Sequence, residues 1–387
     1  MTSSLCLLLL VPTLAAADTP PVGTLTIHDG VLYRDGKPFR AFGLNVRDLA
    51  DDVLDKGAAA KESFDTIALL GEKKVPFIRF WASYFDNRKK FLADPDRYWK
   101  NMDLLIDACE KAHVGLAPTL FWDSWNVPWT FGEYCKDWGD PTSQTRAFME
   151  RYTKEFVERY RGRSAIWFYE FSNENNLAWD LPNAMEFLKG HQDARNVAHW
   201  EVGRDSIAAF GRAVRALDPW RPLSSGCSQP RGCQWHLANF KAPGSPWETD
   251  TPEQTAIAAG WTAPDPVDLL CIHSYMPHLK YDGAKTRAEI AQYSAIAKSL
   301  GRPLYVGEWG VLDGDGKLDA TFDDQLYMAH ARDFCQVLYE NKVPLCCWWD
   351  FSPKGWGYGM GAADLVHKRF NWVLDMLAEY NAKIAAE

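Results

Sequence analysis

Short apolar runs with strand character alternate with amphipathic helical stretches along most of the chain. Apolar residues at 24–27 and 31–33 flank the turn pair Asp29-Gly30, which predicts a β-hairpin near the amino terminus. Eight further strands are predicted at 39–45, 75–81, 115–122, 165–174, 222–227, 268–275, 303–309 and 343–351. Helices are predicted between them, near 62–74, 96–113, 142–161, 200–217, 251–259, 285–300 and 321–341, and after the last strand near 367–384.

The helix predicted over 142–161 shows the helical period most clearly. Its aromatic residues recur every four positions and form one apolar stripe: Phe148, Tyr152, Phe156 and Tyr160. Eight strands alternating with helices predict an α/β fold, a (β/α)8 TIM barrel with long loops at the carboxyl-terminal face of the strands. A doubly wound sheet is the alternative, but no G-x-G-x-x-G turn follows the first barrel strand.

The first 17 residues are set apart from the rest. An apolar run over 5–14 is followed by Ala15-Ala16-Ala17, and it is too short to span a bilayer. We therefore expect residues 1–17 to be a signal peptide and the protein to be secreted or periplasmic. Residues 18–387 contain no linker or repeat, so we expect them to form one catalytic (β/α)8 domain that begins with the hairpin.

Charge and composition narrow the partners. The net charge of −9 argues against nucleic acid or an anionic membrane surface. We expect a glycan partner, because many of the 18 tryptophans fall near predicted strand ends and loops, where indole faces suit sugar rings. We also expect the protein to be a monomer. The tryptophans in question are Trp122, Trp125, Trp129, Trp138, Trp179, Trp235, Trp247, Trp261 and Trp309.

We expect no metal and no cofactor. Neither Cys-x-x-Cys nor His-x-His spacing occurs. Asp313, Asp315 and Asp319 resemble a calcium loop, but glycines interrupt the ligand spacing and the closing glutamate is missing. Cys227 and Cys233 could close a short disulfide loop in an oxidising compartment.

Two predicted strands end in a glutamate. The run from Ala165 ends in Ser172-Asn173-Glu174, and the run from Pro303 ends in Gly307-Glu308-Trp309. The carboxyl ends of barrel strands carry the active sites of such folds, so the two carboxylates are expected to meet across one barrel mouth. The alternative is that each is a polar strand end without a chemical role.

The order of motifs along these strands resembles the retaining barrel hydrolases, and most closely glycoside hydrolase family 5, the cellulase and mannanase family. The resemblance covers about residues 38–355. It rests on Arg79 in Phe-Ile-Arg-Phe-Trp, Tyr169-Glu170 ahead of Asn173-Glu174, His273-Ser274-Tyr275, Glu308 in Gly-Glu-Trp-Gly, and Trp349. It implies retaining hydrolysis of a β-linked polysaccharide or oligosaccharide, with β-1,4-glucan or β-mannan favoured.

The resemblance also assigns roles. Glu308 would be the nucleophile and Glu174 the acid/base, with their carboxyl groups about 5–5.5 Å apart. Arg79 would keep Glu308 ionised, and Glu174 would need a raised pKa to hold its proton. The expected substrate-binding residues are Arg79, Asn173 at the sugar 2-hydroxyl, His273, Tyr275, Trp122, and Trp349 as a sugar platform, with Trp348 packing on the opposite face.

Two departures from the family pattern and several rival hypotheses remain. No histidine stands near Trp122 at the end of the third strand, and Asn175 replaces the proline that often follows the Asn-Glu pair. Arg79 could instead be a core residue paired with Glu170. The main rival function is a non-catalytic carbohydrate-binding protein on a hydrolase barrel. A serine hydrolase lacks its Gly-x-Ser-x-Gly motif here, and a metal-dependent hydrolase lacks its ligands.

Overall fold

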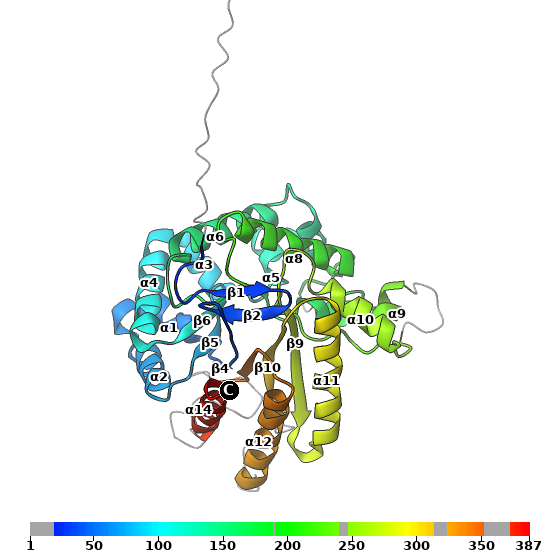
Figure 1. Ribbon diagram of the computed structural model, residues 1–387. Coiled ribbons are helices and arrows are strands. Elements are labelled where there is room, and N and C mark those ends of the chain that lie inside the picture. Colours follow the sequence, from blue (N-terminus) through cyan, green and yellow to red (C-terminus); the bar gives the residue numbers. More distant parts are fainter. Residues whose placement is uncertain (1–18, 189, 240–246, 313–322, 352–371) are drawn as a thin grey trace, which may run out of the picture.

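The computed structural model describes residues 19–188, 190–239, 247–312, 323–351 and 372–387, and it is a barrel (Figure 1). Eight parallel strands form its wall in the order β8-β7-β6-β5-β4-β11-β10-β9. Backbone hydrogen bonds of 3.0 Å from Asp268 and Leu269 to the carbonyl of Leu223 join the two ends of this sheet. The strands are β4 (Ala41–Asn45), β5 (Phe77–Trp81), β6 (Gly115–Phe121), β7 (Tyr169–Ser172), β8 (Leu223–Ser224), β9 (Leu270–Pro277), β10 (Leu304–Leu312) and β11 (Leu345–Trp348). The predicted (β/α)8 fold is confirmed.

Helices surround the strands, and one major helix follows each strand. These are α2 (Lys61–Glu72), α4 (Pro95–Ala112), α6 (Gln144–Tyr160), α8 (Trp200–Arg215), α10 (Pro252–Trp261), α11 (Gly283–Ser299), α12 (Asp324–Glu340) and α14 (Trp372–Ala385). Shorter helices lie in the connections: α1 (Leu49–Lys56), α3 (Phe85–Ala93), α5 (Asn126–Thr130), α7 (Ala184–Phe187) and α9 (Gln234–Asn239). The alternation expected from the sequence is therefore present in the described residues.

The aromatic stripe of α6 shows how these helices are held. All four stripe residues are buried against the barrel, and the hydroxyl of Tyr152 lies 2.6 Å from that of Tyr98 on α4. Burying a large apolar side chain stabilises a fold by about 1.5–3 kcal/mol relative to leaving it exposed. The stripe therefore fixes both the position of α6 and its contact with the neighbouring helix.

The amino-terminal hairpin closes the end of the barrel opposite the site. Strands β1 (Leu25–His28) and β2 (Val31–Arg34) pair antiparallel, and β3 (Lys37–Pro38) adds a short third strand. Asp29 and Gly30 both adopt positive φ, as a tight hairpin turn requires. Leu25 and Leu32 pack in one cluster with residues from the beginnings of the barrel strands. The open end of the barrel is therefore the carboxyl-terminal one.

Most strands are shorter than predicted, and β7, β8 and β11 (345–348 instead of 343–351) are shorter by four residues or more. Strand β7 begins at Tyr169 instead of 165, with a single bridge between Ile166 and Leu116 before it, and β8 has two residues. Gly226 explains the early end of β8. Its φ is +67°, and a Cβ added there would lie 1.7 Å from the carbonyl oxygen of Ser172. The chain thus turns out of the strand beside β7, and only glycine fits.

Three expectations from the sequence concern features outside the barrel: a disulfide, a signal peptide and a calcium loop. Cys227 and Cys233 are free thiols, so the short disulfide loop is not formed. The predicted signal peptide over 1–17 and the calcium-like aspartates at 313–319 lie outside the described residues. Within the described residues, none of the helices combines the length and apolar character that crossing a membrane requires.

Candidate active site

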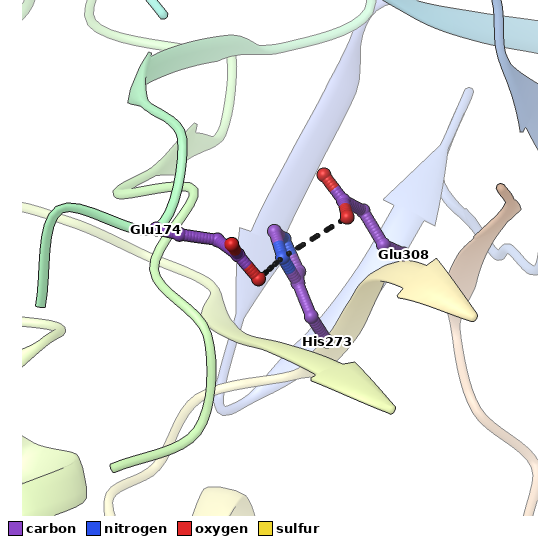
Figure 2. Close-up of side chains that lie close together, drawn as sticks. All are labelled: Glu174, His273 and Glu308. Atoms are coloured by element: carbon purple, nitrogen blue, oxygen red, sulfur yellow. Dashed lines mark hydrogen bonds and ion pairs between the residues drawn. The ribbon is translucent and has the colours of Figure 1, made fainter. Parts of the chain in front are cut away.

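The two candidate carboxylates lie close together at the open end of the barrel. Glu174 follows β7 and Glu308 lies within β10, while His273 comes from β9 between them (Figure 2). His273 Nδ1 lies 2.9 Å from Glu174 Oε1 and 3.4 Å from Glu308 Oε2. One oxygen of each glutamate and one ring nitrogen all lie within 4.8 Å of one another. The strand ends thus bring together residues 134 positions apart in sequence.

Arg79 on β5 is completely buried and forms ion pairs with two glutamates, Glu170 and Glu308. Its guanidinium donates to Glu170 Oε1 at 2.6 Å and to Glu308 Oε1 at 2.7 Å. It also donates to the side-chain oxygens of Asn45 and Asn173, at 3.0 and 2.9 Å. Both interpretations of Arg79 are therefore correct, because it is a core arginine paired with Glu170 and it also pairs with Glu308.

Glu170 is a third acidic group in this network, fully buried below the other two. Besides Arg79, it accepts hydrogen bonds from Thr119 Oγ1 at 2.6 Å and Ser224 Oγ at 2.9 Å. Buried charges are stabilised when they are paired and fully hydrogen-bonded, as this one is. Glu170 thus holds the guanidinium of Arg79 at Nε, while Glu308 accepts from Nη1.

The environments of the two candidate carboxylates differ. Burial raises the pKa of Glu174, while the charges of Arg79 and Arg231 act against that rise. Glu308 accepts hydrogen bonds from Arg79 and from the hydroxyl of Tyr275. The burial of Glu174 thus favours its protonated form, as a general acid requires.

His273 is neutral at ordinary pH. Burial lowers its pKa to about 4, even though Glu308 opposes that change. A neutral imidazole carries one ring proton, and Nδ1 faces both glutamates. Within the described residues, Glu174, His273 and Glu308 also lie close enough together to share a metal ion.

Trp122 and Trp349 directly follow β6 and β11 at the open end of the barrel. The rings of Trp122 and Trp349 stack with centroids 6.1 Å apart, and the Arg79 guanidinium lies 4.5 Å from the Trp122 ring. Trp348 is buried and meets Trp309 edge to face at 4.8 Å, so it packs in the core as expected. The platform role of Trp349 stays a prediction.

The expectation that loop tryptophans lie outside the core is wrong for several of them. Trp138, Trp179 and Trp309 are buried. One face of Trp129 is covered by His191, whose ring stacks on it with centroids 3.6 Å apart. Trp125, by contrast, lines the pocket beside Glu174. Tryptophan content alone therefore overstated the number of available sugar platforms.

That pocket has a volume of about 470 Å³ and begins at Asn173 and Glu174. One part of its wall comes from the β5 and β6 ends, and the other from the segment after β7 and from Arg231. The lining residues are Tyr84, Trp122, Asp123, Trp125, Asn126, Asn173, Glu174, Leu177, Ala178, Leu181, Ala184, Phe187, Leu188, Asn196 and Arg231. A small ligand of drug-like size fits such a volume.

Asn175, which departs from the family pattern, anchors the segment after β7. Its side chain donates to Ser124 Oγ at 2.5 Å and accepts from the indole N–H of Trp179 at 2.7 Å. Trp179 is buried against Gly203, where an added Cβ would lie 2.2 Å from the indole. The departure from proline thus supplies hydrogen bonds that a proline could not make.

Sequence reasoning missed three contributors. Asn45 ends the first barrel strand, and its amide bridges Arg79 and the carbonyl of Gly307. Its place at a strand end was the available signal. Glu170 was recognised as part of the Tyr-Glu motif and as a possible partner of Arg79, but its hydrogen bonds to Thr119 and Ser224 were not foreseen. Arg231 lies in a loop with no recognisable pattern, so only the fold reveals its proximity to Glu174.

The barrel and its paired carboxylates define a glycoside hydrolase. Residues 33–355 match the model of the family described as cellulase (glycosyl hydrolase family 5). The chain therefore belongs to glycosyl hydrolase family 5, as its motifs suggested. It is also 23% identical over 345 residues to mannan endo-1,4-beta-mannosidase 8 of Oryza sativa subsp. japonica, covering 84% of this chain and 90% of that protein.

Solved structures share the fold. An endo-1,4-beta-mannanase from Rhizomucor miehei superposes with a TM-score of 0.61 at 15% identity, covering 94% of this chain and 100% of the other. The catalytic domain of Thermobifida fusca endoglucanase Cel5A has a TM-score of 0.56 at 14% identity, covering 91% and 96% of the two chains. At these identities the superpositions establish the barrel itself.

Proposed function

We propose that the protein is a retaining hydrolase of β-1,4-linked mannan or glucan, with Glu308 as nucleophile and Glu174 as acid/base. The observation that carries this proposal is the pair of unlike carboxylates sharing His273 at the barrel mouth. The mannanase and endoglucanase names of the similar proteins support the substrate class. Glu308 would attack the anomeric carbon while Glu174 gives its proton to the departing glycosidic oxygen.

The remaining polar groups fit the two steps. Arg79 and Tyr275 hold Glu308 by its two different oxygens, which orients the carboxylate for attack. Arg79 also fixes the side-chain oxygen of Asn173, so the amide N–H₂ is available to orient toward a sugar 2-hydroxyl. In the second step Glu174, now ionised, would take a proton from water as it attacks the glycosyl–Glu308 ester.

The experiment compares two variants on β-mannan, β-glucan and aryl β-glycosides. Glu308→Gln should abolish turnover on every substrate, because the glycosyl–enzyme ester cannot form. Glu174→Ala should retain the first step on substrates with good leaving groups, and added azide should restore turnover with a β-glycosyl azide as product. An inverted azide without a covalent intermediate would contradict the assigned roles.

The main alternative, a carbohydrate-binding protein without activity, predicts binding of the same glycans with no product from the wild-type chain. The intact buried network around Arg79 and Glu308 speaks for catalysis, because binding alone does not need a paired nucleophile. We further propose that the protein acts outside the cytoplasm after removal of residues 1–17.

A further inference from the structure

We propose that the pocket beside Glu174 binds an apolar leaving group, so that the enzyme cleaves β-glycosides of alkyl or aryl alcohols. This inference rests on the proposed function, because it takes Glu174 as the acid that protonates the leaving oxygen. Glu174 lines the pocket and Glu308 does not. The sugar attacked by Glu308 therefore meets the pocket at its Asn173 edge, and the group that leaves with the proton from Glu174 lies farther inside it.

The wall contributed by the segment after β7 is aliphatic. Six consecutive lining positions there carry only apolar side chains: Leu177, Ala178, Leu181, Ala184, Phe187 and Leu188. Trp125 also lines the pocket, from the segment after β6. A sugar presents hydroxyl groups around its whole edge, and burying a hydroxyl without a hydrogen bond is unfavourable. An aliphatic or aromatic group therefore suits this wall, and a sugar of a glycan chain would contact it through the apolar face of its ring.

The polar side chains of the pocket are largely engaged with the protein itself. Asp123 forms a two-point ion pair with the buried Arg88, at 2.9 and 3.1 Å, and accepts from Asn126. The side-chain oxygen of Asn196 accepts from Trp129 and from the backbone of Cys135, and its amide donates to His191. These groups stabilise the pocket walls, so they offer little hydrogen bonding to a sugar in the pocket.

Arg231 is held in the same way. Its guanidinium donates twice to the carbonyl oxygen of Leu177. This contact fixes the beginning of the aliphatic wall, while the Asn175 and Trp179 hydrogen bonds fix the chain on either side of it. The apolar surface is therefore held in place by buried contacts, and it is available to a ligand without rearrangement.

The test measures the dependence of hydrolysis on alkyl chain length. Methyl, propyl, butyl and hexyl β-mannosides and β-glucosides have leaving alcohols of nearly equal acidity, so leaving-group chemistry stays constant along the series. Full burial of one methylene raises affinity about fourfold. We expect kcat/KM to rise at least tenfold from methyl to hexyl. A flat series on the wild-type protein overturns the proposal.

Variants locate the effect. Leu181 is buried in the wall, and Leu181→Asn should reduce the hexyl-to-methyl ratio severalfold. Phe187→Gln is a second variant, at a side chain that is 68% exposed and so tolerant of substitution. Ile257→Gln on α10 is the matched control, because Ile257 is an exposed apolar residue that does not line the pocket. An equal ratio in all of these proteins contradicts the assignment.

Calorimetric binding of the same glycosides separates this inference from the proposed function. Binding that strengthens with chain length, in a protein that cleaves no β-mannan, β-glucan or alkyl glycoside, would support the pocket and refute the hydrolase. Cleavage of β-mannan with binding independent of chain length would refute the pocket alone.

Discussion

Removing the carboxylate of Glu170 tests how the charge of Arg79 is balanced. Glu170 is fully buried, and its oxygens accept hydrogen bonds from Arg79, Thr119 and Ser224. In Glu170→Ala the guanidinium keeps only Glu308 as an ionic partner. Breaking a buried ion pair by removing one partner typically costs about 3–5 kcal/mol. We expect a loss of that size in the free energy of unfolding.

Glu170→Gln should be milder. The amide keeps the shape of the carboxylate and can still accept from Arg79, but a hydrogen bond between two ions becomes a hydrogen bond to an uncharged acceptor. The difference between the two kinds of bond is about 1–1.5 kcal/mol. The graded order of wild type, Gln and Ala follows from the hydrogen bonds at this position, and cavity formation alone would not separate Gln from wild type.

Urea denaturation followed by circular dichroism measures these differences. The matched control is Glu379→Gln, which removes a carboxylate that pairs with Arg332 and Lys383 at the surface. Exposed pairs contribute about 0–1 kcal/mol, so this variant should unfold nearly as wild type does. If Glu170→Ala lost less than about 1 kcal/mol, the charge of Arg79 would be balanced by Glu308 alone, and the bridging role argued above would be wrong.

Three further predictions concern Arg231, the loop tryptophans and the amino terminus. Arg231→Gln removes a charge that lowers the pKa of Glu174, so the acid should keep its proton to higher pH and the alkaline limb of kcat/KM should move upward; Arg231→Lys should leave the limb in place. Trp125→Ala should reduce activity severalfold on long glycan chains and hexyl glycosides, which fill the pocket, and affect methyl glycosides less. Trp129→Ala, at a ring already covered by His191, should change both kinds of substrate alike, and the reverse pattern would contradict the pocket geometry. Intact mass of exported protein should correspond to cleavage near Ala17, and a full-length mass would contradict the leader.

The sequence allowed the barrel and the two glutamates to be predicted, because both depend on local patterns. The period of two in strands and of about four in α6 is visible residue by residue, and a glutamate at the end of an apolar run is visible in the same way. The early end of β8 was not predictable, because it follows from the approach of Gly226 to Ser172 on a neighbouring strand. Position 226 shows no local sign of that contact.

The exposure of the loop tryptophans could not be predicted from the sequence either. Trp125, Trp129 and Trp138 occupy one predicted loop and cannot be distinguished by composition. In the folded chain the first lines the pocket, the second is stacked under His191, and the third is buried with its N–H donating to the carbonyl of Ser124. Their partners come from distant segments or from loop geometry, so exposure had to be read from the structure.

The backbone at Glu174 is held by hydrogen bonds that do not involve the apolar segment after it. The amide of Glu174 donates to the carbonyl of Gly226 at 2.8 Å, and the preceding amide of Asn173 donates to Trp122 at 3.1 Å. Glu174 itself has left-handed backbone geometry, with φ of 49°. The acid is thus tied to both adjacent strand ends before the aliphatic segment begins. That segment can therefore diverge, or be exchanged by an engineer for one of another chemistry, while Glu174 keeps its position.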